Sequence, residues 1–399
     1  MSEPGRVLPY GRQSVTADDI EAVADVLRSD WITQGPAVPA FEAELAARCA
    51  VPHAVAVSSA TAALHLACLA LDVGPGDVVW TTPNTFVASA NCARYCGADV
   101  DFVDIDPHTW NLCATALAAK LDAARRSGAR LPKVVIPVHY AGLPPDLEAI
   151  GELAAEYGFR VIEDAAHAVG ATYAGEPVGS CRHSDITVFS FHPVKIITTG
   201  EGGMALTRDA GLAARMARLR THGIVADGSR VTAHPLSPRR FEQVELGWNY
   251  RMTDIQAALG LSQARRLDAF VARRRELSDR YEDALAGLPF RLQRTAGPGV
   301  SARHLFVIRV PATARAGLLD HLCRRDIAPG VHYIPVHLHP YYQRLGFTRG
   351  DFPEAELHYD EAISLPMYPA MTDDDLAAVL DALGEWAVSA RPAEPGDRS

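Results

Sequence analysis

Two stretches of this chain decide its fold: Glu163–His167, which reads EDAAH, and Ser190–Gly203, which reads SFHPVKIITTGEGG. Each overlaps the end of a short apolar run, and the runs Arg160–Glu163 (RVIE) and Ile186–Phe191 (ITVFSF) are typical of buried strands. The glycines after Lys195 indicate that the backbone there turns tightly or approaches a ligand closely. The sequence therefore places acidic residues and a lysine at the ends of two strands.

Around these stretches, short apolar runs alternate with helical patterns from about residue 54 to residue 210. We expect strands at His53–Ser58, Val78–Thr82, Val100–Asp104, Val134–His139, Arg160–Glu163, Ile186–Phe191 and Met204–Thr207, and helices at Ala60–Leu71 and Thr85–Cys96. Continuous apolar strands between helices predict an α/β fold with a mainly parallel, seven-stranded sheet that is buried on both faces. Ligands bind at the carboxyl ends of such strands, which is where Asp164 and Lys195 stand.

The pattern changes after residue 253, and we therefore expect a large domain at 1–253 and a smaller α+β domain at 254–399. The second part begins with Asp254–Leu285, which reads as one long helix rich in arginine. Its later elements are expected to be a strand at His304–Val310, a helix at Ala314–Arg325, an irregular segment at His332–Tyr342 and a last helix at Asp373–Trp386.

Composition restricts the partners and the location of the protein. The formal net charge of −10 argues against non-specific binding of nucleic acid. No window approaches the length of a membrane span, and the first residues hold no apolar signal core. The seven cysteines are scattered, and we expect them to be free thiols in a reducing compartment. These features predict a cytoplasmic enzyme without nucleic-acid or membrane partners.

A histidine-rich run, His332–Pro340 (HYIPVHLHP), raises the alternative of a zinc site. No cysteine or carboxylate cluster adjoins it, and Pro335 and Pro340 interrupt regular structure. We therefore expect no metal.

Lys195 and Asp164 suggest a specific chemistry. A lysine that is partly desolvated at a strand end can form a Schiff base with a carbonyl cofactor, whereas an isolated lysine is usually a solvated surface residue. A carboxylate such as Asp164 can keep the ring nitrogen of that cofactor protonated. The alternative for Asp164 is to cap a helix at Ala165–Val169.

A phosphate group needs hydrogen-bond donors, and Ser58–Thr61 (SSAT) lies where a strand turns into a helix. Backbone N–H groups at a helix start, with hydroxyls beside them, form an anion site. An ordinary helix cap would use the same residues, and both interpretations can hold together. For Phe86, composition alone favours a place in the core.

Further motifs follow one another in a characteristic order. They are Tyr10–Gln13 (YGRQ), Thr33–Pro36 (TQGP), Ser59–Leu64 (SATAAL), Thr85–Phe86, Phe102–Asp106 (FVDID), Pro137–Gly142 (PVHYAG) and Asn249–Asp254 (NYRMTD). With the two stretches quoted first, they span Pro9 to Pro369. In this set the chain resembles the DegT/DnrJ/EryC1/StrS family of pyridoxal-phosphate-dependent nucleotide-sugar aminotransferases.

The resemblance implies the fold-type I architecture of aspartate aminotransferase and pyridoxal 5′-phosphate as cofactor. It implies that Lys195 carries the cofactor and Asp164 faces its ring nitrogen, so that these two residues are catalytic. It implies cofactor contacts from Ala60, Thr61, Phe86, Asp164, His167, Ser190, Lys195 and Asn249. Phe86 would stack on the ring, His167 would face the phenolic oxygen, and Asn249 would reach the phosphate of the neighbouring subunit. A homodimer with composite active sites is therefore expected.

Three stretches look closest to one branch of this family: Ser29–Pro36 (SDWITQGP), Ser190–Lys195 (SFHPVK) and His332–Pro340. That branch is the C4 aminotransferase of pseudaminic acid biosynthesis (UDP-4-amino-4,6-dideoxy-N-acetyl-β-L-altrosamine transaminase), which aminates a UDP-linked 4-keto-6-deoxy-N-acetylhexosamine. L-Glutamate is the usual donor in the family. Candidate substrate contacts are Tyr10, Thr33, Arg251, His332 and Tyr333. Ile196 stands where relatives often have proline, which affects the stiffness of the loop.

Three alternatives remain beside this interpretation. A related sugar dehydratase would have histidine in place of Lys195, so the lysine disfavours it. Amination at C3, or of a dTDP- or GDP-linked sugar, would share every cofactor residue. A catalytically silent relative is disfavoured because no cofactor residue is missing.

Overall fold

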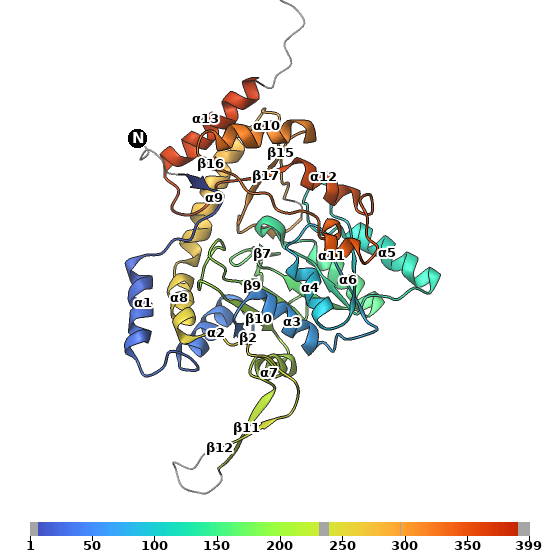
Figure 1. Ribbon diagram of the computed structural model, residues 1–399, viewed down its shortest axis with the longest axis vertical. Coiled ribbons are helices and arrows are strands. Elements are labelled where there is room, and N and C mark those ends of the chain that lie inside the picture. Colours follow the sequence, from blue (N-terminus) through green and yellow to red (C-terminus); the bar gives the residue numbers. More distant parts are fainter. Residues whose placement is uncertain (1–6, 231–238, 296, 390–399) are drawn as a thin grey trace, which may run out of the picture.

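A seven-stranded sheet forms the centre of the computed structural model, which describes residues 7–230, 239–295 and 297–389 (Figure 1). Its strand order is β2-β10-β9-β6-β5-β3-β4. The strands are β2 (His53–Val57), β3 (Val78–Thr81), β4 (Asp99–Phe102), β5 (Val134–Ile136), β6 (Arg160–Asp164), β9 (Ile186–Ser190) and β10 (Gly203–Thr207). Only β10 runs antiparallel to its two neighbours, β2 and β9. The mainly parallel sheet predicted from the sequence is confirmed.

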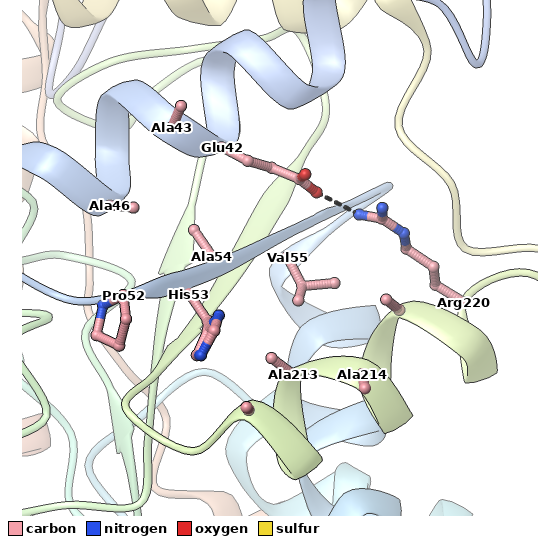
Figure 2. A pocket seen from close by; sticks show the side chains of 12 residues that line it. Glu42, Ala43, Ala46, Pro52, His53, Ala54, Val55, Ala213, Ala214 and Arg220 are labelled. Atoms are coloured by element: carbon pink, nitrogen blue, oxygen red, sulfur yellow. Dashed lines mark hydrogen bonds and ion pairs between the residues drawn. The ribbon is translucent and has the colours of Figure 1, made fainter.

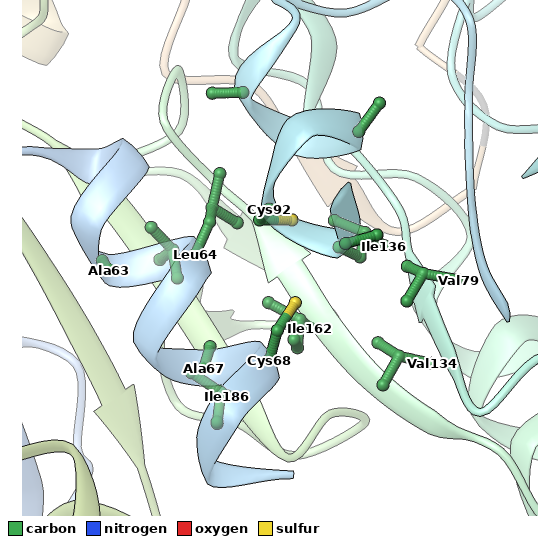
Figure 3. Close-up of a cluster of buried hydrophobic side chains, with 14 of the residues drawn as sticks. Ala63, Leu64, Ala67, Cys68, Val79, Cys92, Val134, Ile136, Ile162 and Ile186 are labelled. Carbon is green, nitrogen blue, oxygen red and sulfur yellow. The ribbon is translucent and has the colours of Figure 1, made fainter. Parts of the chain in front are cut away.

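Apolar side chains fill the layer between this sheet and the helix α3 (Ala60–Ala70) (Figure 3). Leu64 and Cys68 of the helix and Ile162 and Ile186 of the strands belong to one buried cluster. Because α3 carries almost only apolar residues, it is covered on further sides by α4 (Ala88–Tyr95) and α7 (Ala210–Leu219). This burial fixes the start of α3 at the carboxyl end of β2.

The remaining helices of the large part cover other faces. α5 (Ala114–Ser127) and α6 (Leu147–Tyr157) pack with the sheet in a second cluster around Leu117 and Ile150. The helices α1 (Ala17–Arg28) and α2 (Ala37–Arg48) pack against α8 (Asp254–Ala264).

Two helices replace the single helix expected at Asp254–Leu285: α8 ends at Ala264, and α9 spans Leu267–Leu285. The interruption coincides with a polar anchor to α1. The buried Asp19 accepts hydrogen bonds from Ser262 (2.7 Å) and Gln263 (2.8 Å) and pairs with Arg266. The end of α8 is thereby tied to α1, whereas α9 continues into the C-terminal part.

Residues 165–169 form turns and no helix, which differs from the alternative considered for Asp164. The Asp164 carboxylate accepts the Ala166 N–H (3.1 Å), and the Ala168 N–H then returns to the carbonyl of Ala165 (2.8 Å). Such a local hydrogen bond from an aspartate favours a turn over a helix. The helix expected at Thr85–Cys96 is also shorter than predicted, because α4 begins at Ala88.

The C-terminal part is built around a three-stranded antiparallel sheet with the order β13-β15-β17, near the top of Figure 1. Its elements are β13 (Arg291–Leu292), β15 (Phe306–Arg309), α10 (Ala312–Cys323), β16 (Ile327–Ala328), a 3-10 turn (Val336–Leu338), α11 (Pro340–Gln343), α12 (Pro353–Glu361), β17 (Ala362–Leu365) and α13 (Asp373–Ser389). The N-terminal β1 (Leu8–Pro9) pairs with β16. Because α8 lies on α1 and α2, the domain boundary after residue 253 stays a prediction.

Short elements complete the chain. They are a 3-10 turn (Tyr140–Gly142), β7 (Thr172–Tyr173), β8 (Glu176–Pro177), β14 (Gly299–Val300) and the hairpin strands β11 (Ile224–Arg230) and β12 (Arg239–Gln243), which project at the bottom of Figure 1. All seven cysteines are free. In the described ranges, no helix combines the length and apolarity needed to cross a membrane, and no group of three or more His, Cys, Asp or Glu side chains is arranged to hold a metal ion.

The close passage of β10 under the start of α3 yields a stability prediction. A Cβ atom added to Gly203 would lie 2.5 Å from the Ala60 nitrogen and 2.5 Å from the Ser59 carbonyl carbon, and backbone atoms cannot yield easily. We expect Gly203→Ala to lower the free energy of unfolding by roughly 1–3 kcal/mol, the usual cost of overpacking. The measurement is urea unfolding followed by circular dichroism.

A matched control is Gly317→Ala in α10, where an added Cβ would meet nothing within 4 Å. Alanine is the better helix former by roughly 1 kcal/mol, so this variant should unfold at the wild-type urea concentration or above it. Wild-type stability of Gly203→Ala would contradict the close packing of β10 and α3.

Candidate active site

A cavity of about 620 Å³ opens at the carboxyl edge of the central sheet and collects most of the residues predicted from the sequence. Those lining it are Tyr10, Ala60, Thr61, Phe86, Asp164, His167, Ser190, Lys195, His332 and Tyr333. They come from the segment after β1, the β2–α3 turn, the segment between β3 and α4, the ends of β6 and β9 with the turns that follow them, and the irregular segment of the C-terminal part. A volume of this size suits a small-molecule ligand.

Lys195 lies in the turn that follows β9. Its backbone N–H donates to the carbonyl of His192 (2.9 Å), and the buried Ile196 and Ile197 anchor the turn from the other side. Burial lowers the pKa of the Lys195 amine to about 8, although the charge of Asp164 acts in the opposite direction. A useful fraction of the amine is therefore neutral and nucleophilic near neutral pH.

Asp164 is the last residue of β6 and is almost fully buried. Its Oδ1 accepts the Ala166 N–H (3.1 Å), and its Oδ2 accepts the Ser89 hydroxyl (2.6 Å). Both carboxylate oxygens thus have a donor inside the protein. The side chain is held in one orientation at the cavity wall.

The neighbouring carboxylate, Glu163, belongs to a different network. Its Oε2 pairs with the buried His139 (2.9 Å), and its Oε1 accepts the hydroxyls of Ser184 and Thr187. Burial opposes ionisation, but these hydrogen bonds outweigh it and lower the pKa of Glu163. Because Glu163 is engaged here and does not line the cavity, Asp164 is the carboxylate available to a ligand.

Three buried histidines of the cavity, His167, His304 and His332, are neutral. Burial, together with the nearby Lys195, lowers the pKa of His332 to about 3 and that of His167 and His304 well below the ordinary value. Nε2 of His167 is 3.0 Å from the Tyr333 hydroxyl, and its ring lies against His304 with the centroids 4.4 Å apart. Nδ1 of His167 is buried and finds no hydrogen-bond partner among the described residues. That atom is suited to meet a polar group of a ligand.

The start of α3 forms an anion site. The first amides of a helix have no carbonyl partner within it, and the Ser59 side chain caps only the Ala62 N–H (3.1 Å). The amides of Ala60 and Thr61 consequently stay available at the cavity, where the positive end of the helix favours a phosphate. Ser190, at the end of β9, lines the same space.

These residues fit pyridoxal phosphate. The cavity offers an amine for its aldehyde, a buried carboxylate for its ring nitrogen and unpartnered helix amides for its phosphate. Phe86 is 58% exposed although it lies on the cavity wall, so its ring is free to receive a flat ligand.

Three predicted residues lie outside this cavity. Thr33 and Asn249 are exposed on the surface of the chain. Arg251 lines a separate hollow of about 220 Å³, together with Gln34 and Arg220. Within one chain the structure therefore does not bring these side chains to Lys195.

The sequence analysis missed other residues at the site. His304 and Glu201 line the cavity, and Ser89 contacts Asp164. The only sequence signal for Ser89 is its spacing of four residues from Thr85, which would put both on one face of the helix expected at Thr85–Cys96, although α4 itself begins at Ala88. His304 precedes the strand β15 and carries no motif of its own.

A second hollow, of about 440 Å³, lies at the edge strand β2 between α2 and α7 (Figure 2). Small side chains line most of it, and the ion pair of Glu42 and Arg220 crosses it (2.5 Å). Glu42 accepts the Ala56 N–H (2.8 Å) and Arg220 donates to the Ala56 carbonyl (2.6 Å), so the pair satisfies the free edge of the sheet. This hollow has a structural role in the edge, and the chemistry lies with Lys195.

Known proteins resemble this chain in sequence. The model of the DegT/DnrJ/EryC1/StrS aminotransferase family matches residues 13–384. The spore coat polysaccharide biosynthesis protein SpsC of Bacillus subtilis is 40% identical over 384 residues, which is 94% of this chain and 96% of that protein.

Solved structures agree with the fold. The putative sugar aminotransferase Spr1654 of Streptococcus pneumoniae in its PMP form superposes with a TM-score of 0.87 at 30% identity, covering 96% of this chain and 99% of that one. The same protein is known in a PLP form, with a TM-score of 0.86. PseC of Helicobacter pylori, an aminotransferase involved in the biosynthesis of pseudoaminic acid, gives a TM-score of 0.87 at 29% identity over 96% of this chain and all of that one.

The cavity and the comparisons lead to the same conclusion. Its amine, carboxylate and anion site fit pyridoxal phosphate, and proteins of the same fold are known with that cofactor. The protein is a pyridoxal-phosphate-dependent aminotransferase, and it belongs to the DegT/DnrJ/EryC1/StrS aminotransferase family.

Proposed function

We propose that this aminotransferase transfers the amino group of L-glutamate to C4 of a UDP-linked 4-keto-6-deoxy-N-acetylhexosamine. The observation that carries the proposal is the single cavity in which Lys195 and Asp164 face the anion site of α3. The likeness to PseC and to a polysaccharide biosynthesis protein supports a sugar substrate. The seven free thiols support a cytoplasmic location.

The protein would contribute Lys195 as the base and Asp164 as the electrostatic partner of the cofactor ring. When bound, pyridoxal phosphate supplies an aldehyde that condenses with amines and a ring that takes up electrons. The Lys195 amine is proposed to remove the proton from the amino-bearing carbon of the donor and, in the second half-reaction, to deliver a proton to C4 of the sugar. The Asp164 carboxylate would hold the ring nitrogen, and Phe86 would pack on the ring face.

Neutral polar groups on the opposite wall would orient the sugar. Tyr10 packs edge-on against His332 with the ring centroids 4.8 Å apart, and Nδ1 of His332 is 2.8 Å from the Ser364 hydroxyl. The Tyr333 hydroxyl, which is 3.0 Å from His167, lies beside them. Uncharged hydrogen-bonding side chains of this kind suit the hydroxyl and amide groups of an N-acetylhexosamine.

We further propose a homodimer with composite sites. In the described part of the chain no arginine lines the cavity, yet a cofactor phosphate, a nucleotide diphosphate and the carboxylates of glutamate all need donors. Asn249 and Arg251 lie outside the cavity of their own chain, and Phe241 and Leu246 nearby are 67% and 75% exposed. An exposed apolar segment beside unpaired polar groups is typical of a subunit interface.

The substrate assignment is tested with a panel of nucleotide sugars. Purified protein is incubated with L-glutamate and with UDP-, dTDP- and GDP-linked 4-keto and 3-keto sugars, and the amino sugars are identified by mass spectrometry and NMR. We expect the highest kcat/KM for the UDP-linked 4-keto-6-deoxy-N-acetylhexosamine. Preferred amination at C3, or of a dTDP- or GDP-linked sugar, would overturn the assignment while leaving the aminotransferase activity intact.

The assignment of Lys195 is tested by trapping. Borohydride reduction should abolish the yellow absorbance of the holoenzyme, and peptide mapping should find the cofactor on Lys195. Because burial lowers the pKa of this amine to about 8, capture of cofactor by the apoprotein should rise with pH and level off above that value. Lys195→Ala should be inactive.

The control is Lys133→Ala, because Lys133 is half-buried outside the cavity, where it pairs with Asp77 (2.9 Å). It should keep wild-type turnover and labelling. Turnover by Lys195→Ala comparable with that of this control would contradict the assigned role.

The composite site is tested by complementation of two inactive variants, Lys195→Ala and Asn249→Asp. The aspartate places a negative charge beside the phosphate. In a mixed dimer one site collects both changes and the other has neither, so tag-purified mixed dimers should recover roughly half of the wild-type activity.

Three results would count against this model. Activity of Asn249→Asp alone would remove the phosphate role of Asn249. Mixed dimers that recover no activity would show that Asn249 acts at the site of its own subunit. There the carbonyl of the adjacent Tyr250 accepts the Ser58 N–H (2.8 Å) beside the anion site. A monomer at working concentration would exclude composite sites altogether.

A further inference from the structure

We propose that Ser89 is a positioning residue for the aminotransferase reaction, and that Thr85, Ser89 and Asp164 form a directed hydrogen-bond chain that holds the Asp164 carboxylate in place for the cofactor. The proposal rests on the assignment of Asp164 to the ring nitrogen. It adds two residues of α4 and its preceding segment to the machinery that controls the cofactor.

The two hydrogen bonds that link Thr85, Ser89 and Asp164 are short and shielded from water. The Thr85 and Ser89 hydroxyl oxygens are 2.7 Å apart, and the Ser89 hydroxyl is 2.6 Å from Oδ2 of Asp164. Thr85, Ser89 and Asp164 are 2%, 0% and 5% exposed. Water therefore has little access to replace either hydroxyl, and each hydrogen bond must come from the protein.

The number of available protons determines which residue donates in each of these hydrogen bonds. A serine hydroxyl has one proton, and an ionised carboxylate can only accept. Ser89 must therefore give its proton to Asp164, at 2.6 Å, and its alternative acceptor, the Phe86 carbonyl, is more distant at 3.3 Å. The Thr85 hydroxyl must then donate to Ser89. Such a donor strengthens the next hydrogen bond in the chain.

Ser89 affects the reaction by influencing where one proton lies between the cofactor's ring nitrogen and the Asp164 carboxylate. A proton between a pyridine nitrogen and a carboxylate can lie on either atom, and only the protonated ring draws electrons strongly. A hydrogen bond donated to a carboxylate stabilises its charged form. Ser89 thereby favours the proton on the ring nitrogen, and the Ala166 N–H at Oδ1 leaves Asp164 little freedom to rotate away.

The geometry also links two walls of the cavity. Thr85 lines it directly and precedes Phe86, which is the proposed stacking residue, while Ser89 reaches from the first turn of α4 to the end of β6. The same hydroxyl chain therefore ties the ring-stacking wall to the carboxylate wall.

The test compares Ser89→Ala, Ser89→Thr and Asp164→Asn with the wild type, each loaded with cofactor that carries ¹⁵N in its ring. The ¹⁵N chemical shift of the bound cofactor reports where the proton lies, independently of turnover. In Ser89→Ala we expect the shift to move towards that of neutral pyridine, with kcat lowered roughly tenfold or more, because a hydrogen bond to a charged group is lost. Ser89→Thr keeps the hydroxyl and should retain a wild-type shift.

Controls separate this role from folding and from the role of Asp164. Ser278→Ala removes another buried hydroxyl, which contacts Glu282 in α9, and should change neither the ¹⁵N shift nor kcat. Asp164→Asn should show a neutral ring and at least a roughly hundredfold loss of kcat. If Asp164→Asn keeps a protonated ring, the assignment of Asp164 fails. If Asp164→Asn behaves as expected but Ser89→Ala keeps the wild-type shift, the role of Ser89 alone is overturned, whatever its activity.

Thr85→Val removes the outer hydroxyl at nearly constant volume and tests whether Thr85 acts through Ser89. Alone it should lower kcat by roughly threefold, as expected for a neutral hydrogen bond. In a Ser89→Ala background it should have almost no further effect, because Thr85 acts through Ser89. Additive losses in the double variant would show that the two hydroxyls act separately and would overturn the chain.

Discussion

The burial of one carboxylate beside one lysine is the constraint on which the rest of the site depends. Asp164 ends β6 almost without solvent, and Lys195 follows the adjacent β9. Charges without water must be satisfied by the protein. The turn at Ala166 and the hydroxyl of Ser89 satisfy the carboxylate, and the depressed pKa of the amine keeps the lysine reactive. Geometry and reactivity therefore have a common origin in desolvation.

The sequence predicts the features that depend on local patterns of apolar residues. The seven strands, the mainly parallel sheet, and Lys195 and Asp164 at strand ends follow from apolar runs and from the edge that parallel strands share. It does not predict contacts between distant segments. Asp19 on α1 anchors the end of α8, so one expected helix becomes two. His304 and Ser89 enter the site only through packing, and a pattern that is local in sequence cannot reveal them.

The electrostatics of the cavity contrast with those of the whole chain. The protein has a formal net charge of −10, and burial keeps three of the cavity histidines, His167, His304 and His332, neutral. Recognition of anionic groups in one chain therefore falls to helix amides and hydroxyls, which are fixed dipoles that need no proton. Helix amides and hydroxyls keep their polarity across the physiological pH range, and the three buried histidines can form hydrogen bonds without carrying a charge.

The position of β10 has a consequence for the order of folding. β2 is an edge strand whose only neighbour in the sheet is β10, so His53–Val57 has no strand to pair with until Gly203–Thr207 has been synthesised. Contacts between such distant segments form slowly because a long loop must close first. The early part of a growing chain thus holds α3 without its sheet edge. The close contact of Gly203 with the start of α3 can therefore form only after the lysine turn, which precedes β10, has been synthesised.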